Sequence, residues 1–142
     1  MKLNNVVIEA EYMDIILSLI GEPYYVSSVT KIIFMSFCIR HEKNMKSYRT
    51  RKEDFVDVFF RNISFKLATE YKDISKIVHV IDMLNKTNKI RVDGDNIIVQ
   101  EEISHTSENE FLMLCLTRNP NPIKEINKLD ATAMIEEVIR YV

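Results

Sequence analysis

The side chains best suited to chemistry are scattered along this 142-residue chain. Its three histidines, His41, His79 and His105, and its two cysteines, Cys38 and Cys115, show neither a His-x-x-x-His nor a Cys-x-x-Cys spacing. Such spacings bring two ligands to one metal ion. We therefore expect no metal site, and we interpret each histidine as an ordinary polar residue.

Paired carboxylates and glycine-rich loops give no sign of catalysis either. Glu101 and Glu102 are adjacent, as are Glu136 and Glu137, and adjacent side chains point in different directions on a strand or a helix. The chain has only two glycines, whereas a loop that wraps phosphates needs several residues without a Cβ. We expect a protein that is not an enzyme, with no catalytic residue, no cofactor and no small-molecule substrate.

A run of cations is the strongest local charge feature. Between residues 40 and 52 the chain carries six basic side chains and one acid, Glu42. The run has no apolar periodicity, so we predict an exposed loop. This loop either contacts nucleic-acid phosphates without regard to base sequence, or is a solvated loop or a dock for an acidic partner. The six basic residues are Arg40, Lys43, Lys46, Arg49, Arg51 and Lys52.

Composition narrows the class of protein further. Hydrophobic residues make up 46% of the chain and charged residues 28%, as in a globular domain, and the length suits a single domain. The formal net charge of -2 gives no overall field toward DNA or an anionic membrane. Both cysteines lie in apolar runs, which predicts burial. Without a signal peptide, a lipidation pattern or an apolar run of the ~20 residues that cross a bilayer, we expect a cytoplasmic protein.

Two very apolar segments open the chain. Residues 5–20 are apolar on nearly every side of a helical wheel, which predicts a helix that is buried on most sides. Gly21 suits the C-terminal cap of this helix, and Pro23 prevents its continuation. Ser27 or Ser28 is then predicted to cap a second helix that runs to about His41.

The middle of the chain predicts two more helices and a hairpin. A third helix is expected over 53–71, where Phe55, Val56, Phe59, Phe60, Ile63 and Leu67 recur at three- and four-residue intervals. A fourth follows a cap at Asp73, with a buried stripe formed by Ile74, Ile77, Val78, Ile81 and Leu84. Residues 90–99 then place two β-favouring runs around Asp93-Gly94, which predicts a tight hairpin.

The remaining residues are acidic and are expected to be helical. From Glu101 onward there are eight acids and four bases. Ser107 is predicted to cap a helix over 107–116, which the prolines at 120 and 122 must end. A short helix and a better one from about Ala131 are expected to complete the chain.

A single-stripe helix followed at once by a short hairpin is the sequence form of a winged helix. The polar face of that helix is nearly neutral and has no arginine, although arginine is the usual reader of guanine. Lys89 and Arg91 offer a contact from the hairpin, but Asp93 and Asp95 at its tip would repel phosphates. The charges favour a protein-interaction or structural role for this element over nucleic-acid contact. The polar residues of the helix are Ser75, Lys76, His79, Asp82, Lys86 and Asn88.

These expectations combine into one fold class and one division of the chain. We predict a mainly α single domain over residues 1–142 with a small β-hairpin, of winged-helix-like α+β type. Within it, residues 1–41 form an apolar helical pair, residues 53–101 hold the helices and the hairpin, and residues 107–142 form the C-terminal helices.

The organisation resembles a known family. The features are the small size, two apolar N-terminal helices at 6–20 and 29–39 joined by Gly-Glu-Pro-Tyr-Tyr, and the helix and hairpin over 74–99. Together they resemble the middle components of bacterial three-component ABC systems, which include the small subunit of Lamassu anti-phage defence complexes. Many members of that family carry an Asn-Pro near the first helix, where this chain has Asn4-Asn5 and no proline.

The resemblance implies a non-catalytic accessory subunit in antiviral defence. Such a subunit binds an SMC- or Rad50-like ATPase, helps to recruit or restrain an effector such as a nuclease, and contributes to DNA-end sensing. There are no family catalytic residues to transfer. The alternative is a winged-helix transcriptional regulator that binds DNA through residues 75–88.

Overall fold

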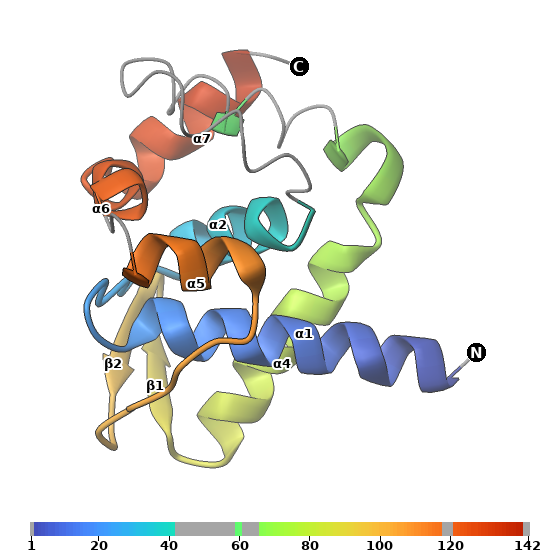
Figure 1. The fold of residues 1–142 in the computed structure, drawn as a ribbon, viewed down its shortest axis with the longest axis vertical. Coiled ribbons are helices and arrows are strands. Elements are labelled where there is room, and N and C mark those ends of the chain that lie inside the picture. Colours follow the sequence, from blue (N-terminus) through green and yellow to red (C-terminus); the bar gives the residue numbers. More distant parts are fainter. Residues whose placement is uncertain (1, 42–58, 61–65, 118–120, 141–142) are drawn as a thin grey trace.

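The structure is a computed structural model that describes residues 2–41, 59–60, 66–117 and 121–140. The described chain is mainly helical and has one small antiparallel sheet of two strands, as predicted. In Figure 1 the hairpin lies at one end of the molecule and α6 and α7 lie at the other, with α1 crossing between them. The elements are α1 (Lys2–Ile20), α2 (Val29–His41), α4 (Asp73–Lys86), β1 (Ile90–Asp93), β2 (Asn96–Val99), α5 (Glu110–Thr117), α6 (Asn121–Asn127) and α7 (Ala131–Arg140).

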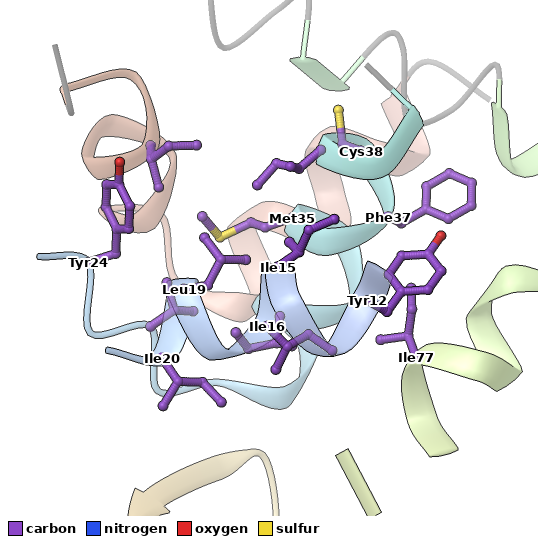
Figure 2. Packing of buried hydrophobic residues seen from close by; sticks show 14 of the residues in the cluster. Tyr12, Ile15, Ile16, Leu19, Ile20, Tyr24, Met35, Phe37, Cys38 and Ile77 are labelled. Atoms are coloured by element: carbon purple, nitrogen blue, oxygen red, sulfur yellow. The ribbon is translucent and has the colours of Figure 1, made fainter. Parts of the chain in front are cut away.

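The core forms where α1, α2 and α4 pack on one another. Tyr12 of α1 lies beside Phe37 of α2 and Ile77 of α4 at this junction (Figure 2). The helix α1 is buried along its second half, whereas residues 4–7 are exposed because its first turns extend past α4 (Figure 1). Burial of large apolar side chains supplies the main stabilisation of such a junction. The buried side chains of α1 are Tyr12, Ile15, Ile16, Leu19 and Ile20.

The stripe predicted for α4 is correct except at one position. Ile77, Ile81 and Leu84 are buried as expected, and Ile74 is half-buried against the core. Val78 instead is 47% exposed, and Val80 takes its place in the core. At 100° per residue Val80 lies nearer to the centre of the stripe, which explains the exchange.

The predicted hairpin is confirmed. β1 and β2 pair antiparallel with Ile90 opposite Val99 and Asp93 opposite Asn96, and Gly94 takes a positive φ of 61° in the turn. A glycine reaches this conformation at low cost. The hairpin is attached to the start of α2, because Ser28 forms an isolated antiparallel bridge with Asn96.

The C-terminal helices attach to the core and to one another. α7 packs against α2, and α5 packs against α6. Two hydrogen bonds anchor α6: the Lys31 ammonium donates to the carbonyl of Asn127 over 2.7 Å, and the Asn127 amide donates to the carbonyl of Tyr24 over 3.0 Å. The apolar side chains that these helices bury are Phe111, Leu112, Cys115, Ile123, Ile126, Met134 and Val138.

The predicted caps and breaks have mixed outcomes. Ser28 caps α2, since its hydroxyl accepts the amide of Lys31. The predicted caps at Asp73 and Ser107 are wrong. Asp73 lies within the first turn of α4, after Lys72, and Asn109 caps α5 by accepting the amide of Leu112. Both mispredicted side chains bind partners distant in sequence instead.

Gly21 is needed for a reason other than the predicted helix cap. It shows no left-handed φ, but a Cβ at this position would lie 2.8 Å from the carbonyl oxygen of Ile103. The glycine therefore lets the segment 100–109 pass directly over the end of α1.

Part of the predicted third helix lies outside the described residues. Phe55, Val56 and Ile63 belong to that part. Phe59 and Phe60 are buried in an edge-to-face ring contact, and residues 66–70 are helical.

Among the described residues, no helix is long and apolar enough to cross a membrane. The division into a single domain and the cytoplasmic location remain predictions.

Candidate functional site

The predicted basic contact residues fall into two groups in the structure. Lys43, Lys46, Arg49, Arg51 and Lys52 lie outside the described residues. Arg40 belongs to the last turn of α2, where its side chain is largely buried and bound within the protein. It is therefore placed to join helices rather than to present a charge to a partner.

The hairpin does not present its tip as a free wing. The Asp95 carboxylate accepts hydrogen bonds from the hydroxyl of Ser28, and from the amide and hydroxyl of Thr30 over 2.8 and 2.7 Å. The backbone adds two further hydrogen bonds, from the Val29 amide to the carbonyl of Asp95 and from the Ile97 amide to the carbonyl of Ser27. We call this set of contacts the hairpin latch.

The hairpin latch also has an electrostatic basis. Asp95 lies at the N-terminus of α2, where unpaired amides and the helix dipole favour a negative charge. Although partial burial acts the other way, the hydrogen bonds from Ser28 and Thr30 lower the pKa of Asp95 below its usual value. The acid that the sequence suggested would repel phosphates is thus committed to the protein's own helix.

The polar face of α4 is balanced in charge. Lys86 pairs with Asp82 at 2.8 Å, and Lys76 lies 3.9 Å from Asp73. On the hairpin, Lys89 lies 3.8 Å from Glu101, and Arg91 is exposed. Most cations of this face therefore lie beside an acid, which reduces the net attraction for a phosphate backbone.

The most concentrated polar cluster lies where α1, α2 and α4 meet. Asp73, which is 5% exposed, accepts three hydrogen bonds on one carboxylate oxygen. The donors are the Tyr12 hydroxyl at 2.6 Å, the His41 Nε2 at 2.8 Å and the Arg40 guanidinium at 3.1 Å. Arg40 also donates to Glu11 over 2.7 Å and lies over the Tyr12 ring. We call these residues the Asp73 cluster.

The protonation states of the Asp73 cluster follow from burial and from these contacts. Burial raises the pKa of Tyr12, and the adjacent Asp73 carboxylate raises it further. Burial also lowers the pKa of His41, against the opposing pull of Asp73. The pKa of Asp73 itself is lowered, because the hydrogen bonds from Tyr12 and His41 and the charge of Arg40 outweigh its desolvation. The cluster holds one buried carboxylate in the ionised form among three donors, Tyr12, His41 and Arg40.

A second carboxylate on α1 holds the segment 100–109. Asp14 accepts hydrogen bonds from His105 Nε2 over 2.6 Å, from the Ser107 hydroxyl over 2.8 Å and from the Glu108 amide over 3.1 Å. An Asp, a His and a Ser thus lie together, but both the imidazole and the hydroxyl bind the carboxylate. A nucleophilic triad needs the histidine between the other two, so this group serves attachment and not hydroxyl activation.

Each of the three histidines connects two elements. His79 of α4 contacts Glu9 of α1 at 2.8 Å, while His41 and His105 bind the carboxylates already described. These histidines are interpreted from the sequence as ordinary polar residues. No local spacing indicates their partners, which lie between 32 and 91 positions away in the chain.

Other candidate chemistries find no support in the described residues. No group of three or more potential metal ligands comes together there. Cys38 and Cys115 are both buried, as predicted, and burial raises the pKa of the Cys115 thiol to about 12. A thiol with so high a pKa is a poor nucleophile at neutral pH.

Comparisons with known proteins identify no relative. The chain matches no protein-family model, no curated protein and no solved structure.

Several large apolar side chains remain at the surface of the described chain. On α1 and α4 these are Val6, Val7, Val78 and Met83, and on α7 they are Ile135 and Ile139. Isolated exposed apolar residues are ordinary. Val6 and Val7 at the start of α1, and Val78 and Met83 of α4, nevertheless make the outer surfaces of these two helices partly apolar.

Proposed function

We propose that this chain is a non-catalytic accessory subunit of an SMC- or Rad50-like ATPase complex in bacterial anti-phage defence, where it bridges the ATPase and an effector nuclease. The choice of complex rests on the resemblance in organisation described above. The choice of a protein-binding over a DNA-binding role rests on the hairpin latch.

The hairpin latch supports the proposal because it removes the usual DNA-contacting element. A wing enters a groove with a projecting, cationic tip. Here the turn at Gly94 and Asp95 is bonded to the first residues of α2, and its second acid, Asp93, is exposed. A short hairpin attached in this way stabilises the helical core and presents a negative tip.

The surface of the helices supports the same role. α1 extends past the core with Val6 and Val7 exposed, and α4 exposes Val78 and Met83 next to a neutral set of charges. Surfaces that bind proteins are commonly apolar at their centre and depleted in charge. A subunit that binds a larger partner would bury side chains of this kind.

In this proposal the fold is a modified winged helix. Ser28, which bridges to Asn96, would take the place of the first strand of such a domain. It lies between α1 and α2, and α4 and the hairpin of β1 and β2 follow later in the chain.

The experiment is an affinity purification of the tagged chain from its native host with nuclease treatment, followed by mass spectrometry. We expect a large coiled-coil ATPase at a fixed ratio to the chain, and its recovery should persist after nuclease treatment. Recovery of the chain alone would contradict the proposal.

One observation favours a second candidate, a winged-helix DNA-binding regulator. The bridge between Ser28 and Asn96 stands where the first strand of a winged helix would pair with the hairpin. This candidate predicts sequence-specific DNA binding that survives neutralisation of Lys43, Lys46, Arg49 and Arg51 but is lost when the face of α4 is altered. Loss through the basic residues alone would indicate non-specific phosphate contact.

A further inference from the structure

The turn between α1 and α2 holds two adjacent tyrosines in opposite environments. Tyr24 is 3% exposed and packs in the core, whereas Tyr25 is 59% exposed. The amides of both residues donate to the carbonyl of Gly21, over 3.1 and 3.0 Å. These hydrogen bonds and the buried neighbour fix the backbone of Tyr25, so its ring is held at the surface before any partner binds.

Two carboxylates lie in the segments that surround this ring. Glu22 belongs to the same turn as Tyr25, and Glu22 and Glu102 together raise the pKa of the Tyr25 hydroxyl, Glu22 the more strongly. Glu102 reaches this position because the carbonyl of the next residue, Ile103, lies against Gly21. In the described part of the chain neither carboxylate has an ion-pair partner, whereas the neighbouring Glu101 lies 3.8 Å from Lys89.

An open strand edge lies on the same side of the molecule. The Ile97 amide points away from β1 and donates to Ser27. Backbone groups two residues further along a strand point the same way, so those of Val99 point away from β1 as well. The segment that would lie opposite Val99 does not pair with it, because the amide of Val26 donates to the carbonyl of Leu19 in α1. Val99 is exposed and ends β2 next to the segment that carries Glu102.

We propose that Tyr25, Glu22 and Glu102, with the open edge at Val99, form a docking surface for an extended, arginine-bearing segment of a protein partner. A guanidinium stacks on an aromatic ring and pairs with a carboxylate through two parallel hydrogen bonds, which an ammonium does not do. An extended backbone adds to an open strand edge through main-chain hydrogen bonds. Charge complementarity thus selects a cationic occupant, and the ring and edge select arginine in an extended chain.

This inference rests on the proposed function, which supplies a protein partner. It adds to that function the chemistry of the partner's segment, which is extended and carries arginine. The docking surface lies at the hairpin end of the molecule, away from α7 (Figure 1). The exposed apolar side chains of α1 and α7 therefore stay available for other contacts.

The test uses the full chain and two probe peptides, one of alternating arginine and valine and one with lysine in place of arginine. Binding is followed by backbone amide chemical shifts and by fluorescence anisotropy. We expect shifts concentrated at residues 22–26 and 97–103, and several-fold tighter binding of the arginine peptide. Equal binding of both peptides, or shifts spread over all acidic surfaces, would overturn the proposal.

Three variants make the test specific. Tyr25→Asn removes the ring but keeps a residue that tolerates the φ of 51°, and Glu102→Gln removes one charge at constant shape. Each should weaken the arginine peptide several-fold. Glu136→Gln, which removes an exposed acid from α7, should leave binding unchanged, and an equal loss in this control would reduce the effect to net charge and overturn the proposal.

The outcomes for the two proposals are separable. If Tyr25→Asn still recovers the ATPase at the same ratio from the host, this docking surface is wrong while the proposed function stands. If the arginine peptide binds as expected but no ATPase is recovered, the proposed function is wrong while the surface stands. Self-association that depends on Tyr25 would show that a second copy is the occupant and overturn the assignment to a separate partner.

Discussion

Replacing Asp73 by asparagine removes the charge on which three helices converge. The carboxylate is almost fully buried and accepts hydrogen bonds from Tyr12, His41 and Arg40. A hydrogen bond to a charged group contributes about 1.5–3 kcal/mol, and removal of one partner of a buried ion pair costs roughly 3–5 kcal/mol. Arg40 keeps its second partner, Glu11, at 2.7 Å. We therefore expect Asp73→Asn to lower the free energy of unfolding by about 3 kcal/mol.

The assay is urea unfolding at neutral pH, with the slope against denaturant fitted freely. The slope should stay unchanged, and the midpoint temperature in a parallel thermal scan should fall by roughly 10 °C for a chain of this size. Asp82→Asn is the matched control on the same helix, because Asp82 forms an exposed ion pair with Lys86. Its effect should be far smaller.

Equal stability of the two variants would refute this reasoning. So would an Asp73→Asn protein as stable as the wild type, because the three contacts would then contribute nothing net. A changed denaturant slope would mean that the variant alters the compactness of one of the two states.

Three further predictions concern pH, the hairpin latch and the passage over α1. The pKa values of His41 and Asp73 in the folded protein both lie below their ordinary values. The unfolded chain therefore binds protons more readily at these two groups, and the folded state loses stability as the pH falls below the pKa values of the unfolded chain. The free energy of unfolding, measured by urea melts, should decrease as the pH is lowered from about 6.5 to below about 4. Below about pH 5 the decrease should be less steep in Asp73→Asn, which lacks the carboxylate. Asp95→Asn should lower the free energy of unfolding in urea by about 1 kcal/mol and speed hydrogen exchange of the first amides of α2, as expected when a helix cap is lost. Asp93→Asn is the control and should be nearly neutral. Equal exchange rates in the two variants would contradict the hairpin latch. Gly21→Ala should cost about 1–3 kcal/mol in the same assay because its Cβ meets a backbone carbonyl, and an unchanged stability would show that the segment 100–109 shifts freely.

The order of the helices and the hairpin could be predicted because their signals are local. The stripe of α4 repeats every three to four residues, and Asp93-Gly94 specifies a tight turn from two residues alone. The cap of α2 could be narrowed to Ser27 or Ser28, and it is Ser28, because a cap bonds within its own first turn. Signals of this kind need no knowledge of distant residues.

The polar clusters could not be predicted because their members are far apart in sequence. Asp73 looks like a helix cap until Tyr12, 61 positions earlier, is placed beside it. Asp14 and His105 meet over 91 positions, and only the close passage at Gly21 explains why. One local sign was present: Glu9, Glu11 and Asp14 interrupt a helix that is largely apolar, and a polar group that becomes buried needs a partner.

The three carboxylates of α1 have a consequence for synthesis on the ribosome. Glu9, Glu11 and Asp14 all bind residues that lie later in the chain, and the last of these partners is Glu108, whose amide donates to Asp14. The first helix thus emerges with its apolar residues bare and must wait for most of the chain before its core closes. A chain terminated before residue 105 would leave part of α1 uncovered, and exposed apolar surface of this kind promotes aggregation.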